Sequence, residues 1–206
     1  MRFFDPESKI MQALTFLADL ILLSIYFVLT SLPIVTIGAS ATALYSLFRP
    51  KHDQHSSITI GYFKAFAANW KPATISWCIQ LTLTVLLIVD LYFLQFISSG
   101  FSGVLRVISI VLLVILTAAG SLVYPQIARY NNKLGRYWRN AFLLCFPKLW
   151  MLLPNLVLFL LPEIILIFWP NIYFYFLILR LILLFGFQFY ISSLLMEKLF
   201  RPLEEE

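Results

Sequence analysis

The chain has 206 residues, of which 61% are hydrophobic and 12% are charged, and its mean hydropathy is +0.89. Soluble domains are about half apolar and a quarter charged, so this composition excludes an ordinary soluble domain and indicates an integral membrane protein. The formal net charge of +5 comes from basic residues in short loops between apolar segments, which argues against nucleic acid as a partner.

The N-terminal segment "MRFFDPESKIMQALTFLADLILL" is predicted to be a retained membrane span rather than a cleaved signal peptide. Acidic Asp5 and Glu7 precede the apolar run, and no small-residue cleavage site closes it. The span is expected from about Gln12 to Leu32. Asp19 lies inside it with no obvious basic partner within the membrane, so Asp19 is a functional candidate.

The stretch "SLPIVTIGASATALYSLF" is predicted to break the first helix region. One helix from Ile10 to Phe48 would be nearly 60 Å long, about twice the thickness of a bilayer. Pro33 disfavours helix at Leu32, and Gly38 with its small neighbours permits close helix approach. A short second helix should end near Phe48. If it crosses the membrane there are six spans with both termini in the cytoplasm, which we favour; if it re-enters or lies along the interface there are five, with the N-terminus outside.

Four later segments have the length of membrane spans. They are Ile75 to Phe96, Val104 to Tyr124, Leu149 to Trp169 and Ile172 to Leu195. The turns around Gly100 and at Trp169 to Asn171 are short and uncharged, whereas the segments Arg49 to Lys71 and Pro125 to Lys148 are basic. The positive-inside rule therefore places the basic segments and the C-terminus in the cytoplasm.

Two of the cytoplasmic segments resemble each other: "SITIGYFKAFAANWKP" and "LGRYWRNAFLLCFPKLW". Both have aromatic and basic residues at helical spacing, which predicts amphipathic helices at the cytoplasmic interface. The candidate partner contacts on them are Phe63, Lys64, Phe66, Trp70, Trp138, Arg139 and Phe142. The similarity indicates either a weak internal repeat, about 34–96 and 104–169, or two convergent interfacial belts.

The order of these motifs resembles the YesL-like family of bacterial integral membrane proteins, a domain of unknown function. The most specific part is the Leu-Pro-x-x-Thr-x-Gly-Ala core at Leu32 to Ala39, with Pro33, Thr36 and Gly38. Ser24 departs from the asparagine expected in that family, which puts a role for an amide there in doubt. The resemblance implies an association with bacterial carbohydrate uptake and degradation systems, and no activity.

No catalytic motif, cofactor site or metal site is predicted, so the chain is expected not to be an enzyme. His52 and His55 in "KHDQHSS" have a spacing that would bind a metal only if that loop were helical, and a solvated loop is the simpler interpretation. Cys78 and Cys145 are expected to be packed thiols.

The charges inside the spans are predicted to pair. If the last two spans form a hairpin at Pro170, Glu163 and Arg180 differ in depth by about 5 Å. By the same reasoning Asp90 and Arg106 lie within reach of each other across the Gly100 turn. These residues either form ion pairs that fix helix packing or line a path for a substrate or proton.

Two prolines, Pro154 and Pro162, should kink the span that contains them. Each removes a backbone donor, which frees the carbonyls near Trp150 and Leu158 for donors on a neighbouring helix or for water.

We therefore predict an all-α, polytopic transmembrane helical bundle with five to six membrane segments, forming one domain over residues 1–206. Its broken first helix region and two interfacial helices belong to a multi-pass protein of the bacterial cytoplasmic membrane. The expected function is a non-enzymatic accessory to carbohydrate uptake, in contact with the lipid bilayer and either a transporter complex or a second copy. The alternative is a small transporter with a path lined by Asp19 and the break near Gly38.

Overall fold

The structure is a computed structural model that describes residues 9–49, 57–97, 100–147, 149–168, 177 and 179–204. Within these ranges it leaves out the side chains of residues 100, 149, 151, 163–167, 182–183 and 203–204. The described elements are all helical: α1 (Lys9–Ser31), the 3-10 helix η1 (Ile34–Thr36), α2 (Ile37–Leu47), α3 (Ile58–Leu94), α4 (Gly100–Arg129), α5 (Leu134–Cys145), α6 (Leu149–Phe168), the π-helix η2 (Arg180–Leu184) and α8 (Phe185–Glu204).

The predicted break in the first helix region is confirmed. Helix α1 ends at Ser31, and Pro33 is extended with φ −73° and ψ 111°. Thr36 closes the break, because its hydroxyl lies 2.5 Å from the Thr30 carbonyl oxygen and 2.7 Å from that of Pro33. A helix end leaves such carbonyls without a helical partner, so the side chain of Thr36 replaces bonds that α1 no longer makes.

Helices α1 and α2 form an antiparallel hairpin. Near the turn, the hydroxyls of Thr30 and Ser40 are 2.9 Å apart, and further along Phe16 and Phe48 both pack on the Tyr190 ring. Helix α2 has 11 residues, so at 1.5 Å per residue it is about 17 Å long, roughly half a hydrocarbon core. Helix α2 is therefore a half-length return arm of this hairpin, and the number of membrane spans, five or six, stays a prediction.

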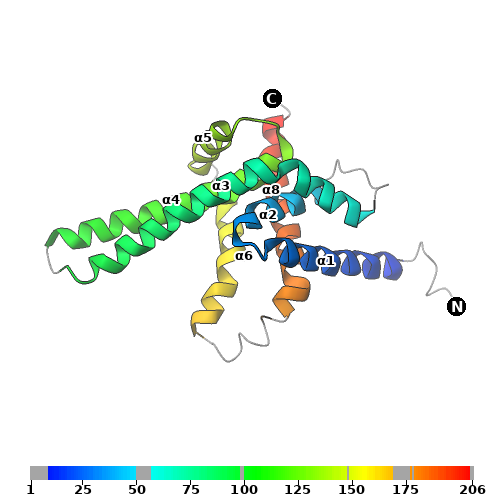
Figure 1. The fold of residues 1–206 in the computed structure, drawn as a ribbon, viewed down its shortest axis with the longest axis horizontal. Helices are drawn as coiled ribbons and strands as arrows, with labels where there is room; N and C mark the ends of the chain where they lie inside the picture. The colour runs from blue at the N-terminus through cyan, green and yellow to red at the C-terminus, as the bar shows by residue number, and fades with distance from the viewer. Residues whose placement is uncertain are drawn as a thin grey trace.

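The return arm lies at the centre of the fold (Figure 1). Every residue from Gly38 to Tyr45 is buried, and α2 contacts α1, α3, α4 and α8. Most of these residues are small, so the surrounding helices approach the α2 backbone closely. The small residues of "TIGASATA" thus make α2 the packing core rather than a surface segment.

Helix α3 differs from the prediction of a separate interfacial helix followed by a span. It runs without interruption for 37 residues from Ile58 to Leu94 and contains Pro72. Proline inside a helix removes one backbone hydrogen bond, and here the helix continues past it. The second amphipathic segment does form its own helix, α5, so the two units of the suggested repeat have different local structures.

The helices do not form one parallel bundle. Figure 1 shows the α3–α4 hairpin projecting to one side of α2, while α6 and α8 run across that direction and α1 leaves on the opposite side. Among the described residues, three segments are long and apolar enough to cross a membrane: Lys9–Ser31, Ile58–Leu94 and Phe101–Arg129. The predicted span at Leu149 is helix α6, whereas the turn at Trp169 to Asn171 lies outside the described residues.

Candidate functional site at the broken helix

A cavity of about 710 Å³ lies beside the break, between α1, α2, α3, α4, α6 and the start of α8. This volume is typical of a small-molecule site. Its surface is mainly aromatic and aliphatic. The largest apolar contributors are Phe27, Trp77, Leu156, Phe159, Phe185 and Phe189.

The polar groups of the lining mostly bond to other protein groups. Tyr124 donates its hydroxyl proton to Gln80 Oε1 at 2.7 Å, and the Gln80 amide occupies the space where Gly120 has no side chain. Tyr45 and Ser192 form a hydroxyl pair at 2.6 Å. Because these groups satisfy one another, the cavity presents an apolar surface with few free hydrogen-bonding positions.

Gly38 lies at the contact between α2 and α3. A Cβ atom added to it would be 2.5 Å from the Ala73 carbonyl oxygen, 2.7 Å from Trp77 Cβ and 3.0 Å from Tyr124 Cε1. The predicted close helix approach is therefore confirmed at this glycine. Trp77 also donates its indole proton to the Ile34 carbonyl at 2.7 Å, so α3 holds the break directly.

Helix α6, which contains Pro154 and Pro162, is bonded to α8 by polar side chains. Gln188 Nε2 donates to the Leu158 carbonyl at 2.6 Å, which is the carbonyl that Pro162 leaves without a helical donor. Ser192 donates to Asn155 Oδ1 at 2.5 Å. The predicted need for a donor from a neighbouring helix is thus confirmed at Leu158.

A second close contact, which sequence reasoning missed, joins α1 to α8. Ser24 Oγ donates to the Leu20 carbonyl at 2.9 Å and accepts the Gly186 backbone N–H at 2.7 Å. A Cβ atom at Gly186 would be 2.5 Å from the Leu20 carbonyl oxygen. Gly186 lies two residues after the end of the π-helix η2, whose wider turn shifts the usual hydrogen-bond pattern. The small residues Ser24 and Gly186 were the only sign of this helix contact in the sequence.

The predicted Asp90–Arg106 ion pair is wrong. Ser109 donates to Asp90 Oδ2 at 2.5 Å, and Arg106 Nη2 instead donates to the Leu94 carbonyl at 2.9 Å. Leu94 is the last residue of α3, where carbonyls lack helical partners and attract a cation. The long arginine side chain therefore caps the helix end.

The other charges that the sequence places inside predicted spans lie as follows. Arg180 lines the cavity, with its guanidinium carbon 4.9 Å from the centre of the Phe185 ring. The side chain of Glu163 lies outside the described residues, so the Glu163–Arg180 pair stays a prediction. Asp19 is half-buried on α1 and is not among the residues that line this cavity, so it does not share a path there with Gly38.

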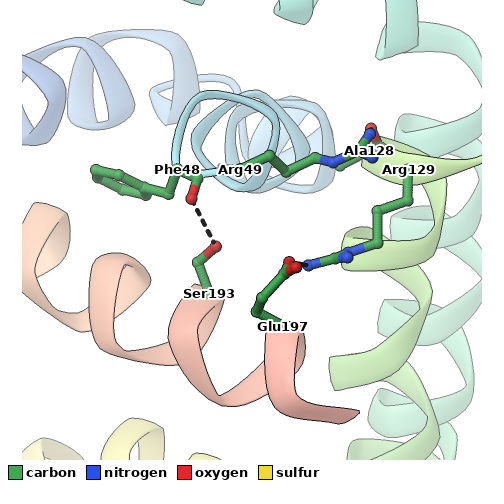
Figure 2. A network of polar contacts seen from close by, with 6 residues as sticks. All are labelled: Phe48, Arg49, Ala128, Arg129, Ser193 and Glu197. Carbon is green, nitrogen blue, oxygen red and sulfur yellow. Dashed lines mark hydrogen bonds and ion pairs between the residues drawn. The ribbon is translucent and has the colours of Figure 1, made fainter. Parts of the chain in front are cut away.

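An ion pair that the sequence did not suggest joins α4 to α8 (Figure 2). Arg129 and Glu197 are 2.5 Å apart, and their side chains are 3% and 28% exposed. Close by, Arg49 donates to the Ala128 carbonyl at 3.1 Å and Ser193 to the Phe48 carbonyl at 3.4 Å. The C-terminal ends of α2 and α4 are thereby fixed to α8.

The candidate partner residues lie on two separate helices. On α3, Phe63, Lys64 and Trp70 are exposed, while Phe66 packs partly on the core. On α5, Arg139 and Phe142 are exposed, and Trp138 packs partly on the core. Helix α5 packs on α4, away from the start of α3, so these residues do not form one surface (Figure 1).

The sequence raised two further kinds of site, a metal site at His52 and His55 and the cysteine thiols. Within the described part of the chain, no cluster of three or more His, Cys, Asp or Glu residues could hold a metal, and His52 and His55 lie outside that part. Cys145 is the last residue of α5 and is buried, and this burial raises the pKa of its thiol, as for a packed rather than a reactive cysteine.

The family comparison fits the part of the fold just described. Residues 18–91 match the family described as "Protein of unknown function, DUF624", which is known as YesL-like. This segment is similar to the DUF624 family, which confirms the predicted resemblance. It contains most of α1, the break, α2 and nearly all of α3, so the family segment coincides with the packed centre of the fold. No curated protein and no solved structure matches the chain.

Proposed function

We propose that this protein is a non-enzymatic accessory of a bacterial carbohydrate uptake system, and that it acts by binding a transporter rather than by carrying the sugar. It would lie in the cytoplasmic membrane with its C-terminus in the cytoplasm. The observation that carries the proposal is the packing of the break. Gly38 touches the backbone of α3, and the adjoining cavity is apolar, whereas a sugar needs many hydrogen-bonding partners along its path.

The first third of α3 is the surface we assign to the partner. With 37 residues, α3 is about 55 Å long, so some 25 Å extends beyond a hydrocarbon core of about 30 Å. Phe63 and Trp70 are 46% and 47% exposed there, and Lys64 is exposed between them. Exposed aromatic residues beside a cation are typical of the anchors of protein interfaces.

The test is co-purification from native bacterial membranes with a tagged chain. We expect a membrane transporter to be retained in stoichiometric amount, and the Phe63→Ala/Trp70→Ala variant to lose it at unchanged expression. The exposed hairpin residues Val107 and Val111, each changed to Ala, provide a control that should retain the partner. If no partner is retained by the unmodified chain in mild detergent, the accessory function is wrong.

A transporter function is the second candidate, favoured by one observation. The cavity of about 710 Å³ borders the broken helix and includes the cation Arg180. In that case proteoliposomes that contain only this protein should take up a solute, and Arg180→Gln should abolish the uptake. Solute flux without any partner would favour this function over the accessory one.

A further inference from the structure

Helix α5 has two different faces. Tyr137, Ala141 and Cys145 are buried against α4. The outer face carries Phe142 and Leu143, which are 38% and 65% exposed, and it ends beside Phe146, which is 63% exposed. Three large apolar side chains thus point away from the rest of the described chain.

The orientation of α5 is fixed by its first turn. The Tyr137 hydroxyl donates to the Tyr130 carbonyl at 2.6 Å and accepts the Asn132 backbone N–H at 2.9 Å. These two bonds join the helix to the end of α4 and to the connection between α4 and α5. The outer face therefore keeps one direction relative to the membrane-spanning part of α4.

The short connections also keep α5 close to the bilayer. Helix α4 ends at Arg129 and α5 begins at Leu134, while α5 ends at Cys145 and α6 begins at Leu149. Three or four extended residues span at most about 14 Å. Trp150, at the start of α6, is 87% exposed and lies one helical turn beyond Phe146 in sequence. Tryptophan is enriched at the membrane–water interface, so this residue marks the expected depth of α5.

The charge of this region has one sign. Lys133, Arg136 and Arg139 are exposed on or next to α5, and the sequence contains no Asp or Glu between Asp90 and Glu163. Arg136 and Arg139 lie among the exposed apolar residues of the outer face. An anionic lipid leaflet has negatively charged headgroups above apolar acyl chains. Basic side chains can bind the headgroups while large apolar side chains enter the acyl region.

We propose that the outer face of α5 binds the anionic lipid headgroups of the cytoplasmic leaflet. Arg136 and Arg139 contact lipid phosphates, and Phe142, Leu143 and Phe146 insert between the headgroups. Arg139 and Phe142 are then lipid contacts rather than contacts with a protein partner. The proposal is independent of the accessory function, because it concerns the chain alone in a bilayer.

The test places a spin label at Leu143→Cys in a Cys78→Ala/Cys145→Ala background, with the protein alone in lipid nanodiscs. In nanodiscs of phosphatidylcholine with about one third phosphatidylglycerol, we expect the label to collide with oxygen more than with a water-soluble nickel chelate. Arg136→Gln/Arg139→Gln should reverse this preference. We also expect added phosphatidylglycerol to raise the melting temperature of the parent protein in detergent. The arginine variant should lose most of this rise.

A variant with two exposed bases removed outside α5, Lys71→Gln/Lys198→Gln, is the matched control and should keep both responses. If the label at residue 143 stays accessible to the nickel chelate in the nanodiscs that contain phosphatidylglycerol, the proposal is overturned. The same holds if the arginine variant responds to phosphatidylglycerol like its parent. Protection of the label only after addition of a co-purified protein would identify a protein partner for α5 and would also overturn it.

Discussion

Gly38 illustrates how a single missing side chain supports this fold. Lipid solvates apolar side chains as well as a protein interior does, so helix association in a membrane depends on close contact and polar bonds. At Gly38 the backbones of α2 and α3 approach until a Cβ atom would lie 2.5 Å from the Ala73 carbonyl oxygen. Ala73 belongs to a helical backbone that cannot move locally. The glycine is therefore required by its neighbours rather than by its own conformation.

We expect Gly38→Ala to destabilise the protein by about 1–3 kcal/mol, which is the usual cost of forcing an extra methyl group into a packed contact. Gly103 is the matched control, because nothing lies within 4 Å of the Cβ atom that alanine would add there. Alanine is the better helix former, so Gly103→Ala should be neutral or slightly stabilising. Thermal aggregation in detergent measures both variants.

The larger change Gly38→Leu separates packing from membrane insertion. Leucine is compatible with the bilayer, so the amount of protein in the membrane fraction should not change while the melting temperature falls further. Leu112→Phe, at a position that is 49% exposed on α4, should melt like the unmodified protein. If Gly38→Ala and Gly103→Ala behave alike, the packing account of the α2–α3 contact fails.

At the scale of elements, α6 and α8 show how the hydrogen bond lost at a proline is replaced from outside its own helix. Pro162 removes the donor for the Leu158 carbonyl, and Gln188 supplies a replacement at 2.6 Å. An unsatisfied carbonyl in an apolar environment costs free energy, so the proline and the glutamine should depend on each other.

We expect a double-mutant cycle between Pro162→Ala and Gln188→Leu to show this dependence. Gln188→Leu alone leaves the Leu158 carbonyl without a donor, whereas Pro162→Ala restores the helical donor and makes the glutamine dispensable. The coupling should be about 0.5–2 kcal/mol in the free energy of unfolding, the range found for hydrogen bonds in membrane proteins. Additive effects within error would show that the glutamine does not compensate for the proline, and Phe187→Leu on the exposed face of α8 serves as the control.

The ion pair between Arg129 and Glu197 is one of the contacts that join the helix ends in Figure 2. Arg129 has a side chain that is only 3% exposed, so loss of its acidic partner would leave a charge in a poorly solvated place. We expect Glu197→Gln to lower stability by up to about 3 kcal/mol, the lower part of the range for a broken buried pair, because Glu197 is itself 28% exposed. The double variant with Arg129→Leu should recover part of this loss in the same melting assay. If the effects of the two single changes simply add in the double variant, Arg129 and Glu197 are not coupled.

The sequence predicts elements well where local chemistry decides them. Pro33 ends α1, small residues mark the contact surface of α2, and Pro162 predicts a free carbonyl at Leu158. The continuous course of α3 past Pro72 could not be predicted, because a helix that packs on both sides of a proline can lose one hydrogen bond and continue.

Contacts between distant segments were the other part that the sequence did not reveal. Ser24 meets Gly186 and Arg129 meets Glu197 only because α8 packs across α1 and α4. The pairing of Asp90 with Arg106 failed for a related reason, since depth arithmetic ignores the helix-end carbonyls that compete for an arginine.

At the scale of the whole molecule, the contacts group the helix ends. The Phe16 end of α1 and the Phe48 end of α2 share Tyr190, while Tyr130 after α4 packs against Phe200 of α8 with ring centres 6.3 Å apart. Gly100 lies at the far end of the α3–α4 hairpin (Figure 1). The Phe16 end of α1 and the Phe48 end of α2 therefore meet at one place on α8.

Cysteine labelling can show on which side of the membrane the start of α1, the α3–α4 turn and the connection before α5 lie. In a Cys78→Ala/Cys145→Ala background, we expect Gly100→Cys to react with a membrane-impermeant maleimide in intact cells. Lys9→Cys and Lys133→Cys should react only after the cells are permeabilised, because basic segments stay in the cytoplasm and the α1–α2 hairpin returns the chain to its starting side. The permeabilised sample also serves as the control that each cysteine can be labelled. Reaction of Lys9→Cys in intact cells would place the N-terminus outside and support the five-span arrangement, in which α1 crosses alone. Reaction of Lys133→Cys would reverse the orientation of the whole chain and remove the cytoplasmic assignment of α5.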